Sequence, residues 1–390
     1  MRVKKLSGSE LTAARKIQSI AFNSGTDFSD AAPAEAKSET YGAYNDAGKL
    51  CSCAELLPRE AFFNGRLMQM ACIGGVATLP EERANGCVRA LLRHILDEAH
   101  MRTITGSFLY PFSHTYYRKF GYELCNTVGR VKISLKAFEN LEKTGSVTQF
   151  FPEESRQEII DIYETFAADK NFMLRRSTDS WDDILGADPY KDRCYIYVWR
   201  DGAGQARSYA ILKIKPEFRA DIEAAELIWT TPESLRGILA FMGTFSASYG
   251  SFVWNAPSFL NLGLLIKEAY TVETELNCFG MFRIVDAAEI FSSLASPEKE
   301  GELSIQLSDD FLTWNNGVFT LSWTGTGSVL VQKTEAEPDI TCDIQTAAQL
   351  VSGYATPTEL VGVGRLFIQS KAEELSELFK NRQGCITDQF

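Results

Sequence analysis

Apolar and polar residues change their period within one stretch of the chain, residues 70–99. A mostly apolar run over residues 70–78 contains two glycines, and Pro80 ends it because proline cannot donate to a neighbouring strand. Apolar residues then recur at the spacing of one helix face, at Val88, Leu91, Leu92, Ile95, Leu96 and Ala99. The pattern predicts a strand, a tight loop and a helix, with Arg83 to Gly86 at the start of the helix.

The start of this helix is a candidate anion site. Unpaired N–H groups gather at a helix N-terminus and the helix dipole adds positive charge, so phosphate binds at such places. Gly86 would let a ligand approach the backbone closely, and Arg83 would add a charge-assisted hydrogen bond. An isolated R-x-x-G also arises by chance, and Gly86 alone would serve as a turn residue. The absence of Gly-Lys-Ser/Thr and of further glycines argues against a nucleotide P-loop and a Rossmann fingerprint.

The elements around this stretch predict a mixed α/β sheet. In order they are a helix over 9–22, a hairpin over 41–58, a strand over 67–78 after an Asn64-Gly65 turn, a parallel strand over 103–110, a short helix to Phe120 and final strands to Leu135. Ser7 or Ser9 is expected to cap the first helix and Ser113 the short one. Hairpins, one long helix and a parallel crossover strand together make such a sheet.

A polar linker is expected over residues 140–146, and the pattern then repeats. A helix over 151–172, a hairpin over 195–214 and a β-run over 225–231 follow one another, and Pro232 ends this run as Pro80 ends the first. The loop after Pro232 is shorter, so we expect a duplicated domain whose phosphate loop has been lost.

The last hundred residues predict a third, α+β region. The expected elements are a helix over 284–294, strands over 301–307, 317–323 and 327–333, and helices over 344–354 and 373–379.

Length, composition and charge restrict the classes of protein. With 390 residues, two or three domains are expected, and 45% hydrophobic with 23% charged residues is typical of a soluble globular protein. A net charge of −12 argues against nucleic acid or an anionic membrane as the main partner and favours cationic ligands. Three histidines and nine scattered cysteines without a C-x-x-C pair argue against a metal site. No apolar run is long enough for a membrane span, so we expect a cytoplasmic protein with reduced thiols.

Residues 76–88, VATLPEERANGCV, resemble the acetyl-CoA motif of GNAT acetyltransferases, V-x-V-x-P-x-x-R-x-x-G-x-G/A, except that Val88 replaces the final small residue. Tyr110-Pro111-Phe112-Ser113 and the segment 117–122, YRKFGY, resemble the second half of the same fold. Together with the chain length and the chain end, these motifs resemble the enhanced intracellular survival (Eis) family of GNAT N-acetyltransferases.

The resemblance implies an α/β (α+β) protein of three domains and a homo-oligomer, a hexamer in that family. The implied domains are a catalytic GNAT domain (1–142), a degenerate GNAT-like domain (143–283) and a domain similar to sterol carrier proteins (284–390). Acetyl-CoA would be the co-substrate, with no metal. Its implied contacts are Val76, Thr78, Arg83, Ala84, Gly86, Cys87 and Val88, and the backbone N–H groups of Val76 and Thr78 would polarise the thioester oxygen.

Two catalytic groups follow from the resemblance. Tyr117 matches the family tyrosine that would protonate the leaving thiolate, whereas without that match a packed aromatic is the better interpretation. The carboxylate of Phe390 would be the general base, although an α-carboxyl pKa of about 3.5 requires a desolvated site or a bridging water. A frayed tail is the alternative. His114, near Tyr117, is a further candidate base without an identified partner.

The acceptor side is less defined. Residues 22–36 contain Phe22, Asp27, Phe28 and Asp30, which would line an acidic lid over an amine substrate or simply form a short helix and a solvated loop. The expected acceptors are amines of cationic small molecules, aminoglycoside-like or polyamine-like, or protein lysines. A non-catalytic CoA-binding or lipid-binding protein is the alternative.

Overall fold

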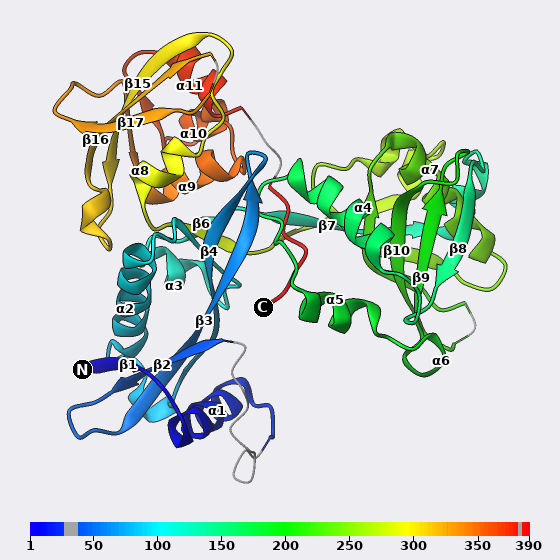
Figure 1. Cartoon of the computed structure of the whole chain (residues 1–390), viewed down its shortest axis with the longest axis horizontal. Coiled ribbons are helices and arrows are strands. Elements are labelled where there is room, and N and C mark those ends of the chain that lie inside the picture. Colours follow the sequence, from blue (N-terminus) through cyan, green and yellow to red (C-terminus); the bar gives the residue numbers. More distant parts are fainter. Residues whose placement is uncertain (27–37, 218, 326, 381–383) are drawn as a thin grey trace. The chain divides into compact units, whose positions relative to one another are not determined.

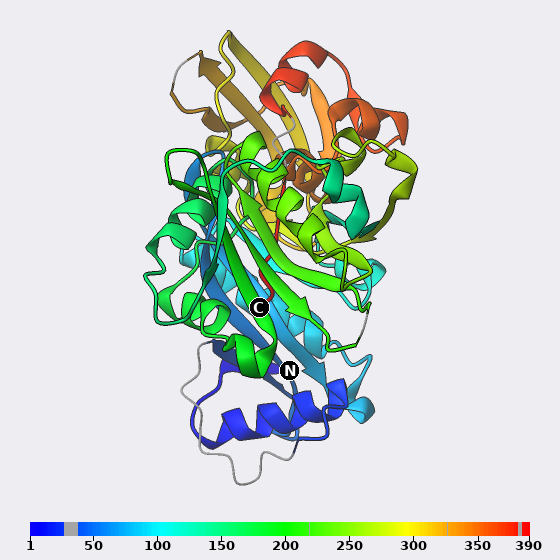
Figure 2. The same ribbon diagram turned by 90° about the vertical axis from the view of Figure 1, so that its right-hand side faces the viewer.

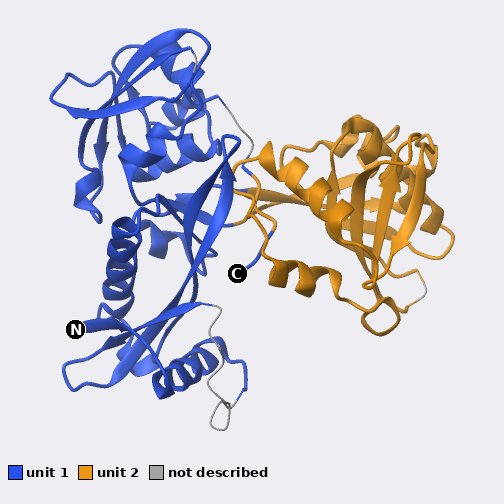
Figure 3. Cartoon of the chain, in the orientation of Figure 1, with its two compact units in different colours: residues 1–126, 280–384, 388–390 blue, residues 127–279, 385–387 orange. Residues whose placement is uncertain are grey.

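We describe the protein from a computed structural model that covers residues 1–26, 38–217, 219–325, 327–380 and 384–390. The chain divides into two compact units (Figure 3). Unit 1 comprises residues 1–126, 280–384 and 388–390, and unit 2 comprises residues 127–279 and 385–387. The chain therefore passes between the units more than once, and three sheets are distributed over them.

The first sheet belongs to unit 1 and has the strand order β1-β2-β3-β4-β5-β14-β6. Its strands β1 to β4 and β6 are labelled in Figure 1. Its strands are β1 (Arg2–Lys5), β2 (Glu39–Tyr44), β3 (Leu50–Phe63), β4 (Arg66–Thr78), β5 (Gly106–Leu109), β6 (Glu123–Leu124) and β14 (Met281–Ile284). Pairing is antiparallel from β1 to β4, and β4 and β5 are parallel. Asn64 and Gly65, both with positive φ, connect β3 to β4, so the predicted two-residue turn is confirmed.

Helices cover both faces of this sheet. Successive strand residues point to opposite faces, and Cys53 packs with α1 (Ser9–Phe22) whereas Ala54 packs with α2 (Cys87–Met101). Both helices form where the apolar spacing predicts them. The short α3 (His114–Arg118) follows the predicted Ser113 cap, whose hydroxyl accepts from Tyr116 N. The predicted serine cap of α1 is wrong, because Gly8 occupies the N-cap position without a side-chain hydrogen bond.

The second sheet belongs to unit 2 and has the order β13-β7-β12-β11-β10-β9-β8. Its elements, drawn mostly in green in Figures 1 and 2, are β7 (Thr127–Ser134), β8 (Ser146–Phe150), α4 (Gln157–Ala168), α5 (Thr178–Leu185), α6 (Pro189–Asp192), β9 (Cys194–Arg200), β10 (Ala206–Ile214), β11 (Ile222–Trp229), α7 (Pro232–Met242), β12 (Ser251–Pro257) and β13 (Val272–Cys278). The predicted hairpin, β-run and helix of the repeat are confirmed.

One strand of each repeat lies in the other repeat's sheet. β7 was expected to complete the first sheet, but it pairs with β12 and β13, and β14 returns to the first sheet between β5 and β6. The passage between the units falls after Asn126 and not at the polar stretch 140–146. The three domain ranges expected above stay a prediction.

A third, five-stranded sheet in unit 1 has the order β17-β16-β15-β18-β19. The elements of this part are α8 (Ala287–Ser292), β15 (Glu300–Ser308), β16 (Gly317–Thr324), β17 (Leu330–Thr334), β18 (Ile340–Asp343), α9 (Ile344–Ser352), α10 (Pro357–Gly362), β19 (Phe367–Ile368) and α11 (Ala372–Leu378). The helix expected from residue 284 begins only at Ala287, because Ile284 belongs to β14. Phe311 and Leu312 from this part complete the core under α2.

Candidate active site

Strands β4 and β5 separate in the middle of the first sheet. Their parallel pairing runs from Met70 to Ile73 and stops there. Directly after this point Gly75 has a φ of 56°, and the register of β3 with β4 shifts. The bulge and the end of pairing leave one edge of β4 without its neighbour over the last residues of the strand.

Alternation along β4 directs two backbone N–H groups to this open edge. Leu79 N donates to Cys51 O on β3 at 3.0 Å, so the N–H of Thr78 faces the opposite edge, and that of Val76 faces the same way. The Thr78 hydroxyl is 2.8 Å from Ser52 Oγ, which holds the strand end against β3. The two residues predicted to polarise a thioester therefore lie at the splayed edge.

The loop after β4 presents its backbone to solvent. A 3₁₀ turn over Pro80–Glu82 leads to Ala84, which has a φ of 65° although it is not glycine, and to Gly86, with a φ of 81°. Such a conformation is uncommon for a residue with a side chain, and the surrounding structure must hold it in place. Gly86 is the N-cap of α2 and makes no side-chain cap, so the first N–H groups of α2 have no side-chain acceptor. A Cβ at Gly86 would meet no atom within 4 Å.

The charged side chains of the described loop differ in how they are paired. Glu81 and Glu82 are bound by Lys49, at 2.8 and 3.5 Å. Arg83 is exposed and forms no ion pair with a described carboxylate. An exposed guanidinium beside uncapped N–H groups is the arrangement that suits a phosphate.

Cys87 and Val88 support the loop from inside. Cys87 is buried and its thiol contacts Glu82 O at 3.7 Å, and burial together with the Glu82 charge raises its pKa. Val88 packs against the core beneath α2. Their side chains pack the first turn of α2 against the core, so only their backbone N–H groups can reach a ligand at the start of this helix.

Tyr117 lies inside an aromatic cluster. It is 3% exposed, and its ring lies 5.5 Å from Phe112, 5.4 Å from Tyr116 and 6.2 Å from Tyr122. Burial is the main cause that raises the pKa of Tyr117 far above its ordinary value, so the phenol keeps its proton. Within the described ranges its hydroxyl has no hydrogen-bond partner.

The chain end lies against the first sheet. Tyr110 donates from its hydroxyl to Asp388 O, and its ring lies 5.0 Å from the Phe390 ring. A Cβ at Gly74 would lie 3.6 Å from the terminal oxygen of Phe390. The terminal carboxylate therefore lies beside β4 where β4 leaves β5. It pairs with no described lysine, arginine or histidine.

The remaining predicted residues are spread around this region. His114 begins α3, and its Nε2 is buried without a hydrogen bond to any described residue. Phe22, at the end of α1, is 59% exposed. Asp27, Phe28 and Asp30 lie outside the described residues. The lid interpretation of this segment stays a prediction.

Sequence reasoning missed two residues. Tyr110 follows β5 and holds the tail, and its motif was noted only as part of the fold. Glu55 lies on β3 opposite Gly74. Its position was visible as one acidic residue within the run Leu50–Leu57, which is otherwise apolar or small.

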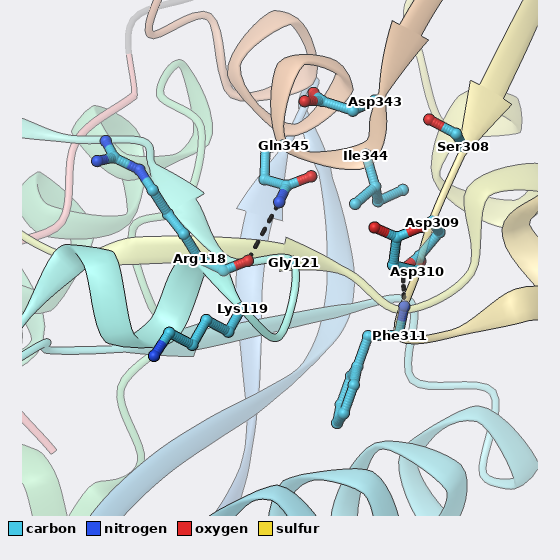
Figure 4. A pocket seen from close by; sticks show the side chains of 10 residues that line it. All are labelled: Arg118, Lys119, Gly121, Ser308, Asp309, Asp310, Phe311, Asp343, Ile344 and Gln345. Carbon is cyan, nitrogen blue, oxygen red and sulfur yellow. Dashed lines mark hydrogen bonds between the residues drawn. The ribbon is translucent and has the colours of Figure 1, made fainter.

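A separate cavity of about 170 Å³ lies between the end of α3 and the third sheet (Figure 4). It is lined by Arg118, Lys119, Gly121, Ser308, Asp309, Asp310, Phe311, Asp343, Ile344 and Gln345. The Gln345 amide donates to Arg118 O at 3.1 Å across it. None of the predicted site residues lines this cavity. Among the described ranges, no group of three metal-ligating side chains occurs, and no helix is long and apolar enough to cross a membrane.

Comparison with known families identifies the three parts. Residues 2–125 match an acetyltransferase (GNAT) domain model, residues 173–284 match a second acetyltransferase (GNAT) domain model, and residues 287–386 match a sterol carrier protein domain model. The predicted fold class, two tandem GNAT domains followed by a sterol-carrier-like domain, is confirmed.

Solved structures share the fold over the whole chain. A probable N-acyltransferase from Enterococcus faecalis is 24% identical, with a TM-score of 0.87 and coverage of 100% of this chain and 99% of that one. A GCN5-related N-acetyltransferase from Anabaena variabilis (21% identity, TM-score 0.88) and Eis1 from Mycobacterium abscessus (18%, 0.82) are each covered completely. The search of curated proteins found no match.

Proposed function

We propose that the chain, which matches two GNAT acetyltransferase domain models and shares the fold of Eis1, transfers the acetyl group of acetyl-CoA directly to a primary amine. Its acceptors would be cationic small molecules, aminoglycoside-like or polyamine-like, or lysines of proteins. The position of the Phe390 carboxylate beside the β4–β5 split carries this proposal, because a general base must reach the amine at the place where the thioester lies.

The loop over residues 83–86 and the start of α2 would hold acetyl-CoA. Arg83 and the N–H groups of Ala84, Gly86, Cys87 and Val88 would bind its pyrophosphate, which fits the uncapped helix start and the open space at Gly86. The N–H groups of Val76 and Thr78 would polarise the thioester oxygen and stabilise the charge that develops there.

The transfer would need one base and one acid. The Phe390 carboxylate, directly or through a water, would take a proton from the acceptor ammonium. The amine nitrogen then forms a bond to the acetyl carbon while the carbon–sulfur bond breaks. Tyr117 would give its proton to the departing thiolate, and its raised pKa keeps that proton in place until then. The newly acetylated nitrogen would lose its extra proton to the Tyr117 oxygen, directly or through a water, which restores the neutral amide and the phenol.

We also propose a cytoplasmic homo-oligomer, a hexamer by resemblance to Eis, that acts without a metal, a membrane or a nucleic acid. Light scattering on the purified chain measures the oligomeric state. A monomer at micromolar concentration would contradict this part alone.

Release of free thiol from acetyl-CoA, followed in the presence of a panel of amines, tests the function. We expect release only with an amine acceptor, and an acetylated amine as the second product. Thiol release that does not depend on an acceptor, or no release with any amine, would contradict amine transfer.

A further inference from the structure

Glu55 is a second carboxylate on the sheet face that carries the terminal carboxylate. It is the β3 partner of Gly74, so its side chain leaves the sheet on the same face as a Cβ at Gly74 would. That Cβ position is 3.6 Å from the Phe390 oxygen. The Phe390 carboxylate therefore lies beside Gly74, and the Glu55 carboxylate lies beside the next residue of β4, Gly75.

The Glu55 carboxylate is oriented by neutral donors. Gln18 Nε2 on α1 donates to Oε1 at 2.6 Å, and Ser38 Oγ donates to Oε2 at 2.8 Å. A Cβ at Gly75 would lie 2.8 Å from Oε1 and 2.3 Å from the Gln18 amide, so only glycine leaves room for this arrangement. The side chain is thus fixed by neutral donors, and no described cation neutralises it.

Among the described residues, no cationic side chain neutralises either acidic group. No described lysine or arginine pairs with Glu55, and none pairs with the Phe390 carboxylate. Two nearby carboxylates repel each other, and a ligand with positive charge removes that repulsion. A monoamine bound at the terminal carboxylate supplies only one such charge.

We propose that Glu55 is a specificity residue that binds a second ammonium group of the acceptor. The enzyme then prefers diamines and longer polyamines over monoamines of the same length. The inference rests on the proposed amine transfer at the Phe390 carboxylate. It assigns no proton transfer to Glu55, because both of its oxygens already accept hydrogen bonds that fix the side chain.

The test compares 1,4-diaminobutane with n-butylamine as acceptors at saturating acetyl-CoA. For the wild-type chain we expect a higher kcat/KM with the diamine. Glu55→Gln should lower kcat/KM for the diamine about tenfold or more, the loss expected for one charge-assisted hydrogen bond, and leave n-butylamine unchanged. Glu60→Gln is the control, because it removes an equal charge from β3 at a residue that does not pair with Gly74. It should leave kcat/KM unchanged for both amines. Added salt should reduce the diamine preference of the wild type.

Gln18→Met provides a second variant that keeps the charge but removes the donor orienting it. It should reduce the preference for the diamine by a smaller factor, with the melting temperature of each variant recorded beside its kinetics. Equal loss with both amines in Glu55→Gln, or an unchanged diamine preference, would overturn the role of Glu55 while amine transfer stands. A wild-type chain that acetylates neither amine would overturn the proposed function and this inference with it.

Discussion

The two GNAT domains begin their main helices in opposite ways. In both, a parallel strand pair separates, after Ile73 in the first domain and after Ala224 in the second. Eight residues lie between the end of β4 and the start of α2, and Gly86 leaves the first N–H groups of α2 without a side-chain acceptor. Only two residues lie between the end of β11 and the start of α7. There Thr231 and Ser234 form a reciprocal capping box, in which the backbone N–H of each donates to the hydroxyl of the other, at 3.1 Å from Ser234 and 3.2 Å from Thr231.

The two helix starts differ in the backbone N–H groups that they leave for an anion. Thr231 and Ser234 satisfy each other's N–H groups, and Pro232 at the first helical position has none to offer. The dipole of α7 remains, but its capping box leaves fewer of the first N–H groups for a ligand than the start of α2 does. The second domain therefore keeps the fold but starts its main helix with fewer free donors.

We expect the largest effect on turnover from replacing Tyr117 of the first domain, compared with a tyrosine of the second domain. Tyr117→Phe keeps the ring and removes the proton, so turnover should fall by about 10²-fold or more while acetyl-CoA affinity persists. The matched change Tyr270→Phe, at an exposed tyrosine of the second domain, should leave turnover unchanged. Steady-state kinetics and calorimetry measure the two properties. Wild-type turnover in Tyr117→Phe would make Tyr117 a packing residue.

The chain end should have the next largest effect. Deleting Phe390 moves the terminal carboxylate by up to about 3.5 Å, one residue of extended chain, and a peptide tag joined to Phe390 replaces it with an amide. Either change should cost about 10²-fold in rate, because misplacement on this scale is enough. An N-terminal tag serves as the control. Folded variants with the normal rate would exclude this carboxylate as the base and direct attention to His114.

The loop can be compared directly between the domains. Arg83→Ala should weaken acetyl-CoA binding by about 1.5–3 kcal/mol, the range for hydrogen bonds to charged groups. Gly86→Val should do at least as much, because its φ of 81° suits glycine and a side chain would fill the open space. Arg236→Ala, on the exposed surface of α7, should leave the affinity unchanged. Calorimetry measures the three affinities. Wild-type affinity for acetyl-CoA in both Arg83→Ala and Gly86→Val would contradict the phosphate-loop assignment.

The smallest effect concerns stability alone. Thr231→Ala removes the hydroxyl of the capping box and should lower the free energy of unfolding by about 1 kcal/mol. Acetyl-CoA affinity should not change, because this cap belongs to the second domain. Urea unfolding of the variant beside the wild type measures the difference. A loss of acetyl-CoA binding without a loss of stability would mean that the second helix start also serves the ligand.

Elements with strong local patterns were predictable. The Asn64-Gly65 turn, the helix face below Gly86 and the Ser113 cap each depend on a few adjacent residues. The cap of α1 was wrong because Ser7 and Ser9 lie on either side of Gly8, and composition alone does not decide which of three neighbours takes the position. The exchange of β7 and β14 was missed because alternating residues show that a strand exists but not which sheet it joins.

The sequence by itself determined the local elements, the loop at Arg83 and Gly86 and the family, because short periods and turn chemistry are written in neighbouring residues. Only the tertiary structure decided that Tyr110 would hold the tail beside Gly74, and that Glu55 would lie opposite Gly74. The hydrogen bond from Tyr110 to Asp388 joins residues 278 positions apart. These contacts follow from strand register and chain crossing, which depend on the packing of the whole sheet and not on any local pattern.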